Sequence, residues 1–119
     1  MAFDPRELAG LVMRVAGELK AYDITILDIS KVSVIADFFV ICSGRSSTNV
    51  QAIAEEIVNK VKEKFSGLTP RTEGIREGRW ILLDYGDVVV HIFQEEERNF
   101  YNIERLWGDA PVVGMTAGL

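Results

Sequence analysis

Apolar residues near the start of the chain recur at the spacing of one helix face. They are Leu8, Leu11, Val12, Val15 and Leu19. Asp4 is a favourable capping residue, Pro5 suits the first helical position, and Glu7 stands at the spacing of a capping box. The pattern therefore predicts a helix from this start to about Lys20.

A second stripe of helical period follows in the middle of the chain. Its members are Val50, Ile53, Ala54, Ile57, Val58, Val61 and Phe65. Thr48 and Gln51 have the spacing of a capping box, and Gly67 with Thr69-Pro70 is a typical stop signal. This stripe predicts a second helix, which begins near Thr48 and ends before Gly67.

Two short apolar runs lie between the predicted helices. Residues 24–29 (ITILDI) are rich in β-branched side chains and predict a strand. Residues 37–43 (DFFVICS) are almost continuously apolar, which favours a central strand buried on both faces. We interpret Cys42, within this run, as a small buried hydrophobic residue.

A hairpin is predicted between residues 80 and 93. Two apolar strands, residues 80–85 and 88–93, flank Gly86-Asp87, a two-residue turn that matches strand twist. Such a turn pairs Trp80 with Phe93 and Leu82 with His91.

The two faces of this hairpin differ in chemistry. One is apolar and is expected to pack against the helices: Ile81, Leu83, Tyr85, Val88, Val90 and Ile92. The other is mixed: Trp80, Leu82, Asp84, Val89, His91 and Phe93. A mixed face with a tryptophan at its end is typical of a protein-binding surface. The alternative is that another segment of the chain covers it, and periodicity leaves both open.

The last third of the chain combines charge with aromatic residues. The run QEEER at 94–98 is followed by Phe100, Tyr101 and Trp107, a composition typical of interface anchors, although charge runs are more often solvated faces. We expect a short helix over 99–106, with Leu106-Trp107 packing back on the domain. Residues 112–119 (VVGMTAGL) have no period, and we expect a mobile tail beyond a single domain of residues 1–111.

Length and charge narrow the class of protein. A chain of 119 residues suits one domain, and the element order predicts an α/β (α+β) fold, a mixed sheet with helices mainly on one face and an open opposite face. The formal net charge of −5 argues against nucleic-acid binding and permits a basic protein partner. Because we find neither a membrane-spanning apolar run nor a signal peptide, we expect a cytoplasmic protein.

The residues that carry chemistry are few. With one cysteine and one histidine, an internal disulfide is impossible and a four-ligand zinc site is nearly excluded, so no metal or cofactor is expected. The turn Gly44–Ser47 joins a strand to a helix start, where free N–H groups can bind an anion. Many such turns bind nothing.

Two longer segments carry a resemblance to a known family. ADFFVICSGRSSTNVQAIAEEI at 36–57 and GRWILLDYGDVVVHIFQEEERNFYNIERLW at 78–107 resemble the ribosomal silencing factors (RsfS, also called Iojap). The match runs from the first helix to about Pro111. It implies a factor that binds the large ribosomal subunit through universal ribosomal protein fourteen, sterically blocks subunit joining and represses translation under nutrient limitation. It also implies a part in large-subunit assembly.

The resemblance implies a fold related to nucleotidyltransferases, and hence an enzyme alternative with nucleotide and magnesium at the Gly44–Ser47 turn. Such enzymes hold magnesium with carboxylates two positions apart on a strand after the turn. No Asp-x-Asp or Asp-x-Glu follows on an apolar strand, and Asp84 and Asp87 diverge across a turn. We therefore expect no catalysis.

Strand alternation and the resemblance together assign a partner-binding surface. A third reading is self-association of the same face, as a homodimer of the free protein. The residues expected to bind the partner are the anchors Trp80, Leu82 and Phe93, the acidic Asp84 and Glu95, and the rim residues Arg98 and Tyr101.

Overall fold

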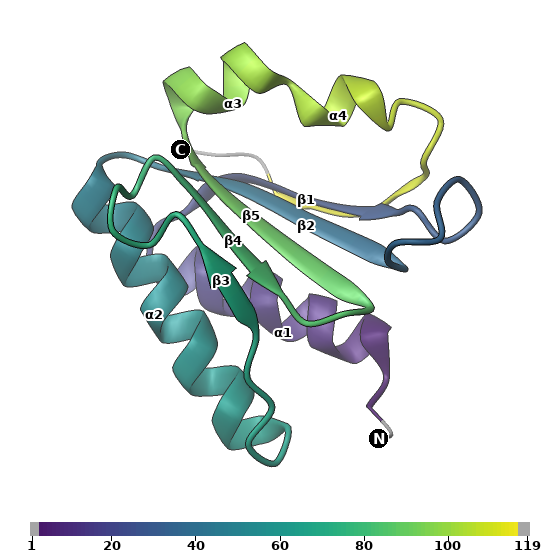
Figure 1. Ribbon diagram of the computed structural model, residues 1–119, viewed down its shortest axis with the longest axis horizontal. Coiled ribbons are helices and arrows are strands. Elements are labelled where there is room, and N and C mark those ends of the chain that lie inside the picture. The colour runs from purple at the N-terminus through teal and green to yellow at the C-terminus, as the bar shows by residue number, and fades with distance from the viewer. Residues whose placement is uncertain (1–2, 117–119) are drawn as a thin grey trace.

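The computed structural model describes residues 3–116, which form one six-stranded mixed sheet with helices on both faces (Figure 1). The strand order is β3-β4-β5-β2-β1-β6, and β2 runs parallel to β5. The helices are α1 (Pro5–Glu18), α2 (Ser47–Lys64), α3 (Glu95–Tyr101) and α4 (Ile103–Leu106), and the strands are β1 (Tyr22–Asp28), β2 (Phe38–Gly44), β3 (Arg71–Glu73), β4 (Trp80–Asp84), β5 (Val88–Gln94) and β6 (Val112–Thr116).

The start of α1 is as predicted, whereas that of α2 differs. Asp4 caps α1 by accepting a hydrogen bond from the N–H of Arg6, at 2.9 Å. Helix α2 is capped by Ser46, whose hydroxyl accepts from the N–H of Asn49, so the predicted capping box at Thr48 is wrong. Gln51, its expected partner, instead donates to backbone carbonyls of the connection between β3 and β4.

The main core lies between the sheet and helices α1 and α2, which cover the same face (Figure 1). Every residue of β2 is buried, as expected of a central strand, and Cys42 is fully buried. The predicted hairpin register is confirmed, because Trp80 pairs with Phe93 and Leu82 with His91. The apolar hairpin face joins this core, as predicted.

The opposite face of the sheet differs from the expectation of an open surface. Helices α3 and α4 run above it (Figure 1), and a second buried cluster lies there. The single helix predicted over 99–106 is two short ones, because Asn102 between them takes a left-handed conformation, with φ 46° and ψ 53°. The first of these begins at Glu95, inside the charge run.

The chain after Pro111 also differs from the prediction of a mobile tail. Val112–Thr116 form edge strand β6, which pairs antiparallel with β1. Gly114 permits this close approach, because a Cβ atom there would lie 3.0 Å from Cδ1 of Ile26. The rest of the expected tail, residues 117–119, lies outside the described residues. Within residues 3–116, no helix combines the length and apolarity needed to cross a membrane.

Candidate docking surface

The mixed hairpin face is partly covered by the chain itself. Two residues of the α3–α4 segment, Ile103 and Trp107, pack on the second cluster, and the Trp107 ring meets that of Phe39 edge-on with centroids 5.5 Å apart. This confirms the covering alternative for part of the face, and the prediction that Trp107 packs back. The buried members of the cluster are Leu27, Ile29, Ala36, Phe39, Ile41, Val89, Phe93 and Ala110.

An aromatic cluster marks the edge of this cover. The Trp80 ring lies 4.9 Å from that of Phe93 and 4.8 Å from that of Tyr101, centroid to centroid. Phe93 has no exposed surface, so the prediction that it is an exposed anchor is wrong. Trp80 and Leu82 are half-buried, and Tyr101 is 51% exposed. The residues with exposed surface at this edge are therefore Trp80, Leu82 and Tyr101.

His91 is a buried part of this arrangement. Its Nδ1 accepts a hydrogen bond from the indole N–H of Trp80 at 3.2 Å, so the neutral ring carries its proton on Nε2. Within the described part of the chain, Nε2 is buried and has no hydrogen-bond partner. Burial lowers the pKa of His91 to about 4, which keeps the imidazole neutral at physiological pH.

Asp84 is held by an ion pair within the chain. Its carboxylate lies 2.9 Å from Arg71 and also accepts the N–H of Gly86 at 2.8 Å. Burial acts to raise the pKa of Asp84, but these hydrogen bonds outweigh it and hold the pKa below its usual value. The Arg71 side chain is almost fully exposed, so this pair is weak and open to exchange with another cation.

Two charged residues of the predicted site lie on α3 and have different surroundings. Glu95 is exposed, and its carboxylate accepts a hydrogen bond from the hydroxyl of Tyr22 at 2.8 Å. The Arg98 side chain is only 11% exposed, because it bonds to Glu104 and Ser43 inside the chain. Arg98 therefore lies beneath the surface, and its predicted place in the hydrogen-bonding rim is wrong.

Two exposed apolar side chains were missing from the predicted site. Phe100 and Leu106 are each 78% exposed, and with Tyr101 they line an open hollow on the α3–α4 segment. Leu106 was expected to pack back with Trp107, but it points to solvent. The interleaving of aromatic and charged residues was the available signal for Phe100. We use the name docking surface for the candidate site formed by Trp80, Leu82, Asp84, Glu95, Phe100, Tyr101 and Leu106.

The Gly44–Ser47 turn is occupied by side chains of the chain itself. The amide of Asn49 accepts the N–H of Arg45, and the hydroxyl of Ser46 accepts the N–H of Asn49. A Cβ atom on Gly44 would lie 2.8 Å from Val50, so the glycine serves close packing of strand on helix. Within residues 3–116, no group of three or more histidine, cysteine or acidic side chains is arranged to hold a metal ion.

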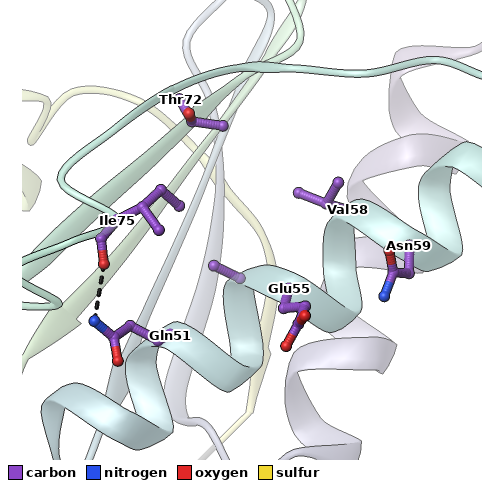
Figure 2. Close-up of a pocket in the computed structure, with 7 residues that line it drawn as sticks. Gln51, Glu55, Val58, Asn59, Thr72 and Ile75 are labelled. Atoms are coloured by element: carbon purple, nitrogen blue, oxygen red, sulfur yellow. Dashed lines mark hydrogen bonds between the residues drawn. The ribbon is translucent and has the colours of Figure 1, made fainter.

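A groove separates α2 from the connection between β3 and β4 (Figure 2). Ala54, Val58 and Ile75 supply apolar walls, and Gln51 bridges the groove by donating to the carbonyl of Ile75 at 2.9 Å. Helix α2 covers the opposite face of the sheet from α3 and α4, so the groove is separate from the docking surface (Figure 1).

Comparison with known proteins places the chain in a family. Residues 2–118 match the family model "Ribosomal silencing factor during starvation". The chain is 46% identical to ribosomal silencing factor RsfS of Halalkalibacterium halodurans, over 91% of this chain and 92% of the relative. It is 48% identical to the RsfS of Bacillus subtilis, over 84% of each. A crystal structure of a Chromobacterium violaceum protein, 32% identical, superposes with a TM-score of 0.84 over 98% of this chain and 95% of that one. The chain belongs to the ribosomal silencing factor family.

Proposed function

We propose that this protein binds the large ribosomal subunit through universal ribosomal protein fourteen and sterically blocks its joining to the small subunit. Translation is thereby repressed when nutrients are limiting, in the cytoplasm where ribosomes work. Family membership supports a ribosome-associated silencing role. The observation that carries the proposal is the docking surface, where three large apolar side chains are at least half exposed beside acidic groups.

The apolar part of the docking surface supplies the anchors. Phe100, Tyr101 and Leu106 stand on one short segment, and Tyr101 lies against Trp80. Aromatic side chains in such a cluster contribute most of the binding energy of typical interfaces, because they lose a large apolar area to the partner. Burial of these side chains by a partner explains why such large apolar groups are exposed to solvent in the free protein.

The charges select the partner. Helix α3 begins with Glu95, Glu96 and Glu97, and the whole chain has a formal net charge of −5. Ribosomal proteins are commonly basic, whereas ribosomal RNA repels an acidic factor. Complementary charge speeds and orients docking on a basic protein, and the apolar anchors then slow dissociation. Asp84 can join this contact by exchanging Arg71 for a basic group of the partner.

Blocking requires bulk rather than chemistry. The described chain measures 34 × 33 × 24 Å along its principal axes, and a rigid body of this size on the joining surface excludes the small subunit. The docking surface occupies one side, so the rest of the body projects outward. The same binding site supports a part in large-subunit assembly.

We also propose a homodimer through the docking surface when the protein is free.

The nucleotidyltransferase alternative has less support. The N–H group of Arg45 in the Gly44–Ser47 turn and that of Asn49 in the first turn of α2 already have acceptors within the chain, which leaves fewer donors for a phosphate. If a nucleotide site exists, magnesium and a nucleoside triphosphate raise the melting temperature. Our proposal expects no such rise.

Co-sedimentation tests the proposal directly. Purified protein is mixed with separated large or small subunits and centrifuged through a sucrose cushion. We expect saturable pelleting, at one protein per particle, with the large subunit alone. Purified ribosomal protein fourteen should compete for the protein. Equal pelleting with both subunits, or no competition by the purified protein, would overturn the proposed partner.

A further inference from the structure

Helices α3 and α4 carry most of the docking surface but have little to hold them in place. They contain seven and four residues, and neither contributes a buried residue. Isolated helices shorter than about 12 residues are marginal in water. Their position on the sheet must therefore come from a small number of side-chain contacts.

One guanidinium group joins both helices to the sheet. Nε and Nη2 of Arg98 on α3 donate to the two carboxylate oxygens of Glu104 on α4, at 3.0 and 2.9 Å. Nη1 donates to the hydroxyl of Ser43 on β2, at 2.9 Å. Ser43 is buried, and the Arg98 side chain is almost so. A planar fork that makes three such bonds fixes direction as well as distance.

This contact spans the bend between the two helices. Asn102 adopts its left-handed conformation between Arg98 and Glu104, and the chain changes direction there. Phe100 and Tyr101 lie on one side of the bend, and Leu106 lies on the other. The angle between α3 and α4 sets the distance between these exposed side chains, so a contact across the bend that holds this angle also holds the shape of the docking surface.

We propose that Arg98 is a positioning residue, which does not touch the partner but holds α3 and α4 in the conformation that binds it. This inference rests on the proposed function for its binding consequence, and on the structure alone for its conformational one. Lysine does not replace arginine here, because one ammonium group cannot serve both carboxylate oxygens and Ser43 in a fixed plane.

Hydrogen exchange and binding test this proposal together. Arg98→Met keeps the length of the side chain and removes the three bonds. We expect backbone amides of residues 95–107 to exchange about tenfold faster, while those of β4 and β5 keep their rates. We expect affinity for the purified large subunit to fall by about tenfold. Arg98→Lys should show most of both effects.

The matched control is Arg79→Met. It also removes one positive charge, together with an ion pair to α3 that is longer and more exposed than that of Arg98. Arg79 lies 3.5 Å from Glu97 and its side chain is 70% exposed. We expect unchanged exchange and unchanged affinity. If Arg98→Met unfolds globally, Glu104→Gln decides, because it keeps the shape and weakens the pair. Unchanged exchange at 95–107 in Glu104→Gln, or unchanged affinity alongside faster exchange, overturns the proposal. Failure of the unmodified protein to bind the large subunit overturns the proposed function instead. In that case the hydrogen-exchange result alone tests whether Arg98 holds α3 and α4 in place.

Discussion

The indole N–H of Trp80 donates a hydrogen bond to Nδ1 of His91, with 3.2 Å between the nitrogen atoms. The bond joins a half-buried residue of the docking surface to a buried residue of β5, whose ring packs against that of Phe39 in the second cluster. It fixes the indole plane and requires a neutral imidazole, because a protonated ring has no acceptor nitrogen. The orientation of the Trp80 ring at the surface therefore depends on the protonation state of the buried His91.

Acidification should destabilise the fold through His91. The pKa of His91 is about 4 in the folded protein, against 6.5 as the ordinary value. The unfolded chain therefore binds more protons at His91 between these limits, so the contribution of His91 to the free energy of unfolding is fully present above pH 6.5 and is lost as pH drops towards 4. The total loss is about 3 kcal/mol. Urea unfolding at pH 7 and pH 5, for the unmodified protein and His91→Gln, measures the larger part of this loss, about 2 kcal/mol. An equal loss in both proteins would assign the effect to other groups.

Replacing Trp80 should affect stability and binding in separable ways. Trp80→Phe keeps the ring contacts with Phe93 and Tyr101 but removes the N–H, and we expect a loss of about 1 kcal/mol with binding largely kept. Trp80→Ala also removes the ring, and we expect a loss of about 2 to 4 kcal/mol and much weaker binding to the large subunit. Denaturant unfolding and co-sedimentation measure the two effects. Full binding by Trp80→Ala would remove Trp80 from the docking surface.

Tyr101→Ala isolates the exposed anchor. More than half of this side chain is exposed, so we expect little change in melting temperature. Affinity for the large subunit should fall by at least about tenfold. Ile75→Ala is the control, because Ile75 is 41% exposed and lies at the groove beside α2. The docking assignment is contradicted if both variants lose affinity equally or neither does.

Cys42 should report on unfolding rather than on function. It is fully buried in β2, and burial raises the pKa of its thiol to about 12, so almost no thiolate forms at neutral pH. We expect an aromatic disulfide reagent to leave the native protein unmodified and to modify one thiol per chain in urea. Rapid modification of the native protein would show that β2 opens locally.

Local signals in the sequence were sufficient for much of the fold. The turn at Gly86-Asp87 set the hairpin register, because a two-residue turn leaves one pairing that matches strand twist. Asp4 and Pro5 marked the start of α1, since both act within the first turn. At the start of α2 three consecutive hydroxyl residues, 46–48, offer possible caps, and the close packing of Gly44 on Val50 accompanies a start at Ser47.

The contacts that shape the candidate site were not readable in this way. Arg98 and Ser43 are 55 positions apart in the sequence, and the local spacing of apolar and polar residues does not predict a hydrogen bond between them. Phe93 alternates correctly onto the mixed face, yet it is buried because Trp80 lies against it and the α3–α4 segment covers that face. Strand β6 is short and at the sheet edge, so its pairing with β1 leaves only a weak sequence signal.

Subunit joining is the most direct test of the central claim. Separated large and small subunits are mixed at a magnesium concentration that favours joining, with increasing amounts of this protein, and resolved on a sucrose gradient. We predict that the joined fraction falls as the protein saturates the large subunit, and that Tyr101→Ala needs a higher concentration for the same effect. An unchanged joined fraction at saturating protein would contradict occlusion.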